Sequence, residues 1–208
     1  MARIVGPKCR ICRRMAMKLF LKGTRCETAK CPMEKEGRPP GQHGEKRIRL
    51  TDFGIHMREV QRAKKMYGVL QRQFRRYYDE ATRLPGNTGD VLIRMLERRL
   101  DNVVYRMRLA ISRDHARQLI LHGHFRVNGR KVTVPSQLVD AGDAVEPAKK
   151  EKSQKIVKDA YALKKNTELP SWLKVDEEPL RGIVVSLPAP GEAAVPLESQ
   201  LIVEYMSR

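Results

Sequence analysis

The chain has 208 residues, and its 42 Lys and Arg against 24 Asp and Glu give a net charge of +18, which points to a polyanionic partner. Only 41% of the residues are apolar and 5% aromatic, so one large buried core is not expected, and no apolar stretch is long enough to cross a membrane. Because the N-terminus lacks an apolar stretch of signal-peptide length, we expect the protein in the cytoplasm.

The first 50 residues are predicted to form a basic, metal-binding arm. Residues 1–90 carry 22 of the 42 basic residues and 9 of the 24 acidic ones, so the positive charge is concentrated toward the start of the chain. Residues 37–44 are rich in glycine and proline and cannot continue a helix. We therefore expect irregular structure over 1–50.

All four cysteines lie in this arm, as Cys9-x2-Cys12 and Cys26-x4-Cys31. Disulfides are not expected, because cytoplasmic thiols stay reduced. Two close cysteine pairs suit tetrahedral zinc, and ion binding supplies folding free energy that so few apolar residues cannot. We predict one structural zinc ion, with an iron–sulfur cluster on the same four cysteines as the alternative. Four unrelated thiols are the competing interpretation.

Residues 51–97 are predicted to be a helical RNA-binding region. Apolar residues repeat at helical spacing after Thr51, which suits an N-cap, and Gly68 interrupts the repeat. A second helix follows over 70–84 and stops at Pro85. Three basic residues of this helix lie off its apolar face and form a cationic ridge: Arg72, Arg75 and Arg76.

A small RNA-binding module is predicted over residues 98–162. One helix is expected over 92–107, and a second helix begins after Ser112, which suits an N-cap. Asn128-Gly129 is the preferred pair for a type I′ turn, so a hairpin is expected over 125–132.

The module also gathers positive side chains. Arg113 and Arg117 share a helix face because they are four residues apart, and the hairpin tip presents Arg130 and Lys131. Such a surface binds by charge and shape, which suits the phosphates of folded RNA.

The rest of the chain is predicted to add strands and one helix. A strand is expected over 144–146, a linker over 147–152, a helix over 156–163, and strands over 181–187 and 200–205. The last two strands make residues 163–208 a C-terminal β tail that packs back on the helical region. The fold class is therefore α+β, with a metal-stapled arm, a helical domain, an α/β module of two helices plus a hairpin, and this tail.

Several motifs resemble the family of bacterial small ribosomal subunit protein four. They are residues 99–106 (RLDNVVYR), 112–120, 123–129 and 142–143 in the module, and 39–44 (PPGQHG) and 201–205 (LIVEY) outside it. The cysteine arrangement is similar to that of the metal-bearing form of the family. The resemblance covers nearly the whole chain.

The resemblance implies a structural constituent of the small ribosomal subunit that binds 16S rRNA directly in its 5′ domain and nucleates assembly of the body. It also implies contact with small-subunit protein five and other small-subunit proteins, a position near the mRNA where it enters the subunit, and a contribution to translational accuracy. Some members repress their own operon. No membrane and no small-molecule substrate is expected.

We do not expect an enzyme. Pseudouridine synthases use an aspartate in an Arg-Leu-Asp context similar to residues 99–101, but here Asp101 lies inside the module and no separate catalytic domain remains. No catalytic residue is therefore predicted. A DNA-binding zinc protein is disfavoured, because no recognition helix follows the cysteines.

Charge and resemblance together predict a set of RNA-contacting residues spread over the arm, the helical region and the module. The predicted contacts are Arg10, Arg13, Arg14, Lys22, Arg25, Arg38, Gln42, His43, Lys46, Arg47, Arg49, Arg72, Arg75, Arg76, Arg106, Arg113, Arg117, His122, His124, Arg126, Asn128, Arg130 and Lys131.

Overall fold

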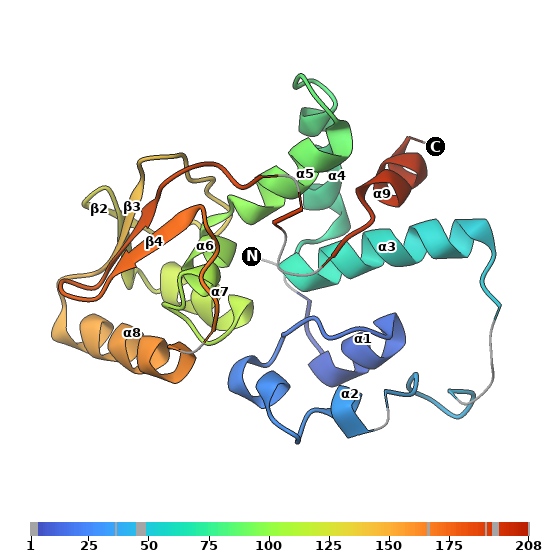
Figure 1. Cartoon of the computed structure of the whole chain (residues 1–208), viewed down its shortest axis with the longest axis horizontal. Helices are drawn as coiled ribbons and strands as arrows, with labels where there is room; N and C mark the ends of the chain where they lie inside the picture. The colour runs from blue at the N-terminus through green and yellow to red at the C-terminus, as the bar shows by residue number, and fades with distance from the viewer. Residues whose placement is uncertain are drawn as a thin grey trace. The chain divides into compact units, whose positions relative to one another are not determined.

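The computed structural model describes residues 4–35, 37–44, 49–165, 167–189, 191–192 and 196–207. The helices are α1 (Lys8–Met15), the 3-10 helix η1 (Gly23–Glu27), α2 (Pro32–Lys35), α3 (Asp52–Tyr67), α4 (Gln71–Ala81), α5 (Thr88–Glu97), α6 (Leu100–Arg106), α7 (Arg113–Leu121), α8 (Glu151–Lys164) and α9 (Ser199–Met206) (Figure 1). The strands are β1 (Phe125–Val127), β2 (Arg130–Val132), β3 (Ala144–Pro147), β4 (Leu173–Asp176) and β5 (Arg181–Val184). Within these ranges no helix combines the length and the apolar character that a membrane crossing requires. Helices together with one antiparallel sheet confirm the predicted α+β class.

Tertiary contacts divide the chain into two units. The first comprises Met1–Ile93 and Ala193–Arg208, and the second comprises Arg94–Glu192. The chain thus leaves the first unit inside α5, builds the second, and returns to the first with its last residues.

The N-terminal arm is more regular than predicted. Irregular structure was expected over 1–50, but α1, η1 and α2 lie there. α1 follows Pro7 and ends at Ala16, whose backbone is left-handed with φ of 54°. These elements have only 8, 5 and 4 residues, which is too short for an apolar repeat to show in the sequence.

The two helices predicted after Thr51 and over 70–84 are confirmed as α3 and α4. Oγ1 of Thr51 accepts a hydrogen bond of 3.2 Å from the backbone N–H of Gly54 and caps α3. α3 ends at Gly68, whose φ of 65° is the left-handed conformation that glycine adopts most readily. On α4 the buried residues form one face: Phe74, Tyr77, Tyr78 and Ala81.

The strand predicted over 200–205 is wrong, because these residues form helix α9. Ile202 and Met206 are four residues apart, share one helix face, and are both buried. α9 packs against α3, where the rings of Phe53 and Tyr205 lie 5.5 Å apart. The contact with α3 buries residues at helical spacing, which overrides the strand preference of the β-branched residues in this segment.

The single helix predicted over 92–107 is also wrong, because one helix, α5, ends at Glu97 and a second helix, α6, begins at Leu100. The backbone N–H groups of Leu100 and Asp101 donate to the carbonyls of Gln137 and Pro135, at 2.8 and 3.0 Å. A distant segment of the chain therefore satisfies the first donors of α6, so α6 begins anew instead of continuing α5.

The sheet of the second unit has the antiparallel order β2-β1-β3-β5-β4. The predicted hairpin β1–β2 and strand β3 are confirmed, whereas β4 was not predicted. β5 pairs with β3 through Val145 and Gly182. Of the two tail strands expected to pack on the helical region, the one that forms is β5, and it extends the sheet of the module together with β4.

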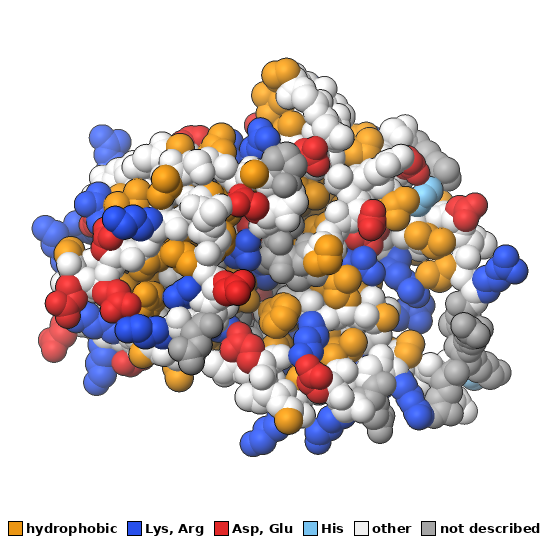
Figure 2. All heavy atoms as spheres, viewed as in Figure 1, with side chains coloured by type: hydrophobic (Ala, Val, Ile, Leu, Met, Phe, Trp, Pro, Cys, Tyr) orange, Lys and Arg blue, Asp and Glu red, His pale blue; other side chains and the backbone are white. Residues whose placement is uncertain are grey.

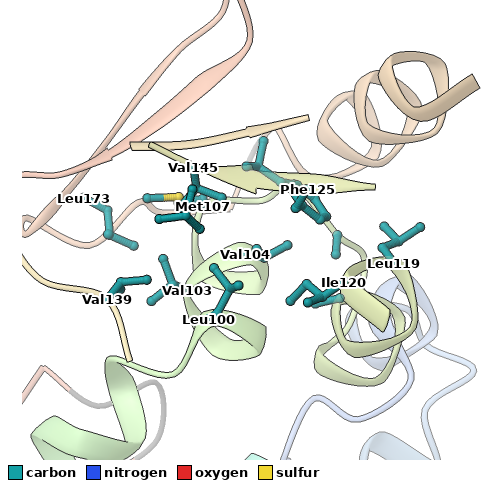
Figure 3. Close-up of a cluster of buried hydrophobic side chains, with 14 of the residues drawn as sticks. Leu100, Val103, Val104, Met107, Leu119, Ile120, Phe125, Val139, Val145 and Leu173 are labelled. Atoms are coloured by element: carbon teal, nitrogen blue, oxygen red, sulfur yellow. The ribbon is translucent and has the colours of Figure 1, made fainter. Parts of the chain in front are cut away.

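The core of the second unit lies between this sheet and α6, α7 and α8. Figure 3 shows Leu100, Val103 and Val104 of α6, and Met107 directly after it, directed toward side chains of the sheet and of α7. Gly182 on β5 is required by this packing, because a Cβ there would lie 2.3 Å from Sδ of Met107. The core fixes the hairpin and α7 on one rigid frame.

Candidate nucleic-acid interface

The tip of the β1–β2 hairpin is a two-residue turn. Asn128 and Gly129 have φ of 51° and 76°, as a type I′ turn requires. In the register, Arg126 lies opposite Lys131 and Val127 opposite Arg130. Because Phe125 and Val127 face the core, Arg126 and Lys131 share the opposite face of the sheet. We call Arg126, Arg130 and Lys131 the cationic hairpin.

Lys131 lies close to Gly123, the residue that follows helix α7 and its cap. A Cβ on Gly123 would lie 2.3 Å from Cε of Lys131, and the φ of Gly123 is 72°. Because Cε belongs to the flexible, exposed side chain of Lys131, which can move aside, the positive φ is the reason for glycine at this position. Lys131 is exposed, so its ammonium group remains accessible to a ligand.

Arg113 and Arg117, both predicted RNA contacts, fasten α7 to α6. Nε of Arg113 donates to Oδ1 of Asn102 at 2.8 Å, and its guanidinium lies 4.6 Å from the ring centroid of Tyr105. Arg113 is only 7% exposed. Nη1 of Arg117 pairs with Oδ2 of Asp101 at 3.2 Å. Arg113 is thus a structural residue of the interior. The guanidinium of Arg117 is engaged in an ion pair within the module.

Three other predicted contacts of the module also have partners within the second unit. Arg106 pairs with Glu97 at 3.5 Å and donates to the carbonyl of Glu192 at 2.8 Å. Nδ1 of His124 lies 2.9 Å from Oγ of Ser153. The side chain of Asn128 is bonded to residues 143 and 144. These groups hold the surface in shape, and the exposed charge of the interface comes from the cationic hairpin.

His122 and His124 lie next to each other, with ring centroids 6.2 Å apart. Burial lowers the pKa of His124, and the nearby His122, Lys152 and Lys150 lower it further. A neutral imidazole at His124 is therefore favoured. His122 is exposed beyond the end of α7.

In the first unit, two of the three arginines of the cationic ridge on α4 are available to bind an anion. Arg72 and Arg76 are exposed, and no partner for either lies in the part of the chain that the structure describes. Arg75 pairs with Asp79 one turn further along, at 3.3 Å. Exposed pairs of this kind contribute little stability, so Arg75 can also turn toward a phosphate.

The predicted contacts of the arm are mostly exposed. Arg13 is half-buried and its Nε donates to the carbonyl of Arg38 at 2.6 Å. The exposed members are Arg10, Arg14, Lys22, Arg25, Arg38, Gln42, His43 and Arg49. Lys46 and Arg47 lie outside the described residues.

A cation that the sequence prediction missed is Arg58 on α3. Burial lowers its pKa, and the charges of Arg14 and Arg62 lower it further, so three arginines lie close together. The sequence does contain a signal for this cluster, because Arg58, Arg62 and Lys65 recur every three to four residues and share a helix face.

The four cysteines are brought into one neighbourhood. Cys12, Cys26 and Cys31 are buried, and Cys9 is half-buried. Burial raises the pKa of Cys12, a hydrogen bond from the Leu19 backbone lowers it, and the other three thiols raise it. The backbone N–H of Lys22 lies 3.3 Å from Sγ of Cys26. Such N–H···S bonds favour thiolates.

The four cysteine thiols are chemically suitable ligands for a metal ion. The thiols are close enough to oppose one another's ionisation, and a dication removes that repulsion. Their geometry is not that of a ready metal site, since within the described residues no group of three or more His, Cys, Asp or Glu side chains has metal-binding geometry.

Comparison with known proteins agrees with the architecture. The family described as Ribosomal protein S4/S9 N-terminal domain matches residues 3–97, and the S4 domain matches residues 98–145. The chain is 50% identical to small ribosomal subunit protein uS4 of Thermodesulfovibrio yellowstonii, 51% to uS4A of Symbiobacterium thermophilum and 48% to uS4 of Halothermothrix orenii. Each match covers all of both chains. The predicted resemblance is confirmed, and the chain belongs to the uS4 family of small ribosomal subunit proteins.

Proposed function

We propose that this chain is a structural, non-enzymatic constituent of the small ribosomal subunit that binds 16S rRNA directly. The observation that carries the proposal is the cationic hairpin, which projects from a rigid sheet within the residues that match the S4 domain. Its relatives are named as ribosomal proteins.

The cationic hairpin suits binding to the backbone of folded RNA. Arg130 and Lys131 are exposed, and neither has a partner in the described part of the chain. A-form RNA hides its base edges in a deep, narrow groove, so a protein recognises it mainly through phosphates and shape. Each phosphate that the hairpin neutralises releases about one counterion.

The first unit offers further cations for the same RNA in two places. They are Arg72 and Arg76 on α4, and the arginine cluster of Arg14, Arg58 and Arg62 on α1 and α3. Arg62 is also paired with Glu59, which leaves the other members to meet phosphates.

The family likeness supports finer assignments. For this chain we propose contact with the 5′ domain of 16S rRNA, early nucleation of the body of the small subunit, and contact with small-subunit protein five. We also propose a position near the mRNA where it enters the subunit, a contribution to translational accuracy, and residence in the cytoplasmic ribosome.

We further propose that Cys9, Cys12, Cys26 and Cys31 hold one structural zinc ion, with an iron–sulfur cluster as the alternative. Three buried thiols and the N–H···S bond to Cys26 support this. When bound, the ion cross-links the cysteine-bearing segments and supplies folding free energy to an arm with little apolar surface.

A binding experiment tests the RNA-binding role. The wild-type chain, the variant Arg130→Gln/Lys131→Gln and the control Lys152→Gln/Lys155→Gln are titrated with a 5′-domain fragment of 16S rRNA at several salt concentrations. The hairpin variant is expected to lose about two from the slope of log affinity against log salt, since two phosphate contacts disappear. The control on α8 removes the same charge and is expected to keep the slope. Equal slopes in all three proteins would reject the hairpin as the contact.

A further inference from the structure

A hollow of about 280 Å³ lies in the second unit, at one end of the sheet. Its wall is formed by the end of β3, the first half of α8 and the turn between β4 and β5, elements that Figure 1 shows together. All of its lining residues lie after position 145, outside the segments matched by the two families, and none is a predicted RNA contact.

The charges around the hollow leave an excess of positive charge. Nε of Arg181 lies 3.1 Å from Oε1 of Glu146, so these two charges balance each other. Lys149 and Lys158 are exposed, and neither has a hydrogen-bond or ion-pair partner among the described residues. Figure 2 shows basic and acidic side chains interspersed over α8, so the excess of positive charge belongs to the wall of the hollow itself. Two uncompensated ammonium groups beside one hollow suit a dianion such as a phosphate monoester.

The rest of the wall suits a flat, partly apolar group. Leu180 is buried, and Pro147 and Pro179 add apolar surface. Gln154 contributes an amide that both donates and accepts hydrogen bonds, as the edge of a nucleobase requires. Apolar walls with a few polar groups are typical of small-molecule sites, and a volume near 300 Å³ lies at the lower end for such sites.

The hollow is held open by regular structure. In the antiparallel register of the sheet, Val145 of β3 lies opposite Gly182 of β5, beside Glu146 and Arg181. Across the β4–β5 hairpin, Asp176 lies opposite Arg181. α8 packs against β3. The site is therefore formed before any ligand arrives, which reduces the entropy cost of binding.

We propose that this hollow binds one phosphate-bearing nucleotide. The phosphate lies at Lys149 and Lys158, because these two cations of the wall have no partner among the described residues whereas Arg181 is paired with Glu146, and the base lies against Pro147 and Leu180. The nucleotide is either a free mononucleotide or an unpaired nucleotide of an RNA strand. The proposal does not depend on 16S rRNA binding by the cationic hairpin, since the two sites share no residue.

The test uses the full chain labelled with ¹⁵N, titrated with adenosine 5′-monophosphate at low ionic strength. Saturable shifts are expected at the amides of Gln154, Leu180 and their neighbours. The variant Lys149→Gln/Lys158→Gln is expected to bind about tenfold more weakly or worse, because two charge-assisted contacts are lost. The matched control Lys152→Gln/Lys155→Gln, on α8 like Lys158, is expected to stay within about twofold of the wild type. All four lysines are exposed, so the amide spectrum of each variant should show a retained fold.

Three results would overturn the proposal: adenosine without phosphate binding as tightly, equal weakening in both variants, or shifts that avoid the hollow. A six-nucleotide single-stranded RNA identifies the source of the ligand. Binding at least tenfold tighter than that of the mononucleotide assigns the site to an RNA strand, and weaker or similar binding assigns it to a free nucleotide.

Discussion

Nδ2 of Asn128 donates a hydrogen bond of 2.7 Å to Oδ1 of Asp143, which joins the tip of the hairpin to the residue before β3. Oδ1 of the same Asn128 accepts from the backbone N–H of Ala144 at 2.9 Å. Both ends of this amide are thus used to set the position of the β1–β2 turn, and Arg130 and Lys131 follow directly after it.

We expect Asn128→Ala to destabilise the second unit by about 2 kcal/mol, because two hydrogen bonds are lost and alanine resists a positive φ. Urea unfolding measures the change. Asn128→Gly loses the same hydrogen bonds but accepts a φ of 51° without strain. The difference in the free energy of unfolding between the two variants therefore measures the cost of the positive φ for alanine. An Asn128→Ala variant as stable as the wild type would contradict this role.

Replacing Arg113 by alanine should mainly reduce stability, whereas replacing Arg130 by alanine should mainly weaken RNA binding. Arg113→Ala leaves Asn102 without its donor in the interior and is expected to cost about 3 kcal/mol of stability. Arg130→Ala should cost less than about 0.5 kcal/mol, yet lower the salt slope of rRNA binding by about one. Chemical denaturation and RNA titration of both variants check this. A reduced salt slope with unchanged stability for Arg113→Ala would mean that Arg113 contacts phosphate after all.

Metal removal should affect the arm and spare the module. We expect one zinc ion per chain by elemental analysis, and its extraction by a chelator should abolish the amide signals of ordered structure around the cysteines. Signals from α6 to β3 should remain, because their core contains none of the four cysteines. Cys9→Ser or Cys31→Ser should reproduce the effect of the chelator. Stoichiometric metal in either variant would argue against four thiolate ligands, and iron with sulfide in place of zinc would select the alternative centre.

The second unit should lose stability as the pH falls below about 7. Burial is the largest cause that lowers the pKa of His115 and of His124, and His124 further lowers that of His115. The unfolded chain therefore binds protons at these sites before the folded chain does, and acid favours unfolding from the ordinary histidine pKa near 6.5 down to the lowered pKa of the folded state. Urea unfolding between pH 5 and 7.5 measures the trend. A His115→Gln/His124→Gln variant should flatten it, and an unchanged slope in that variant would show that other groups are responsible.

Local sequence signals predicted the elements whose ends are marked by the residues themselves. Thr51 and Gly68 delimit α3, Ser112 caps α7, and Asn128-Gly129 specifies the turn of the hairpin. Cap and turn preferences act within a few residues, so they can be recognised without knowledge of the rest of the fold. The uneven charge and the paired cysteines are likewise properties of the sequence alone.

Contacts between distant segments decided the remainder. Residues 200–205 are helical because α3 buries Ile202 and Met206, and α6 starts where residues 135–137 accept its first N–H groups. Arg113 looked like a surface cation, but Asn102 and Tyr105 place it in the interior. Composition and local pattern therefore determined the charge, the cysteine pairs and the capped elements. Burial and long-range hydrogen bonds, which depend on partners far along the chain, determined which cations remain exposed to meet RNA.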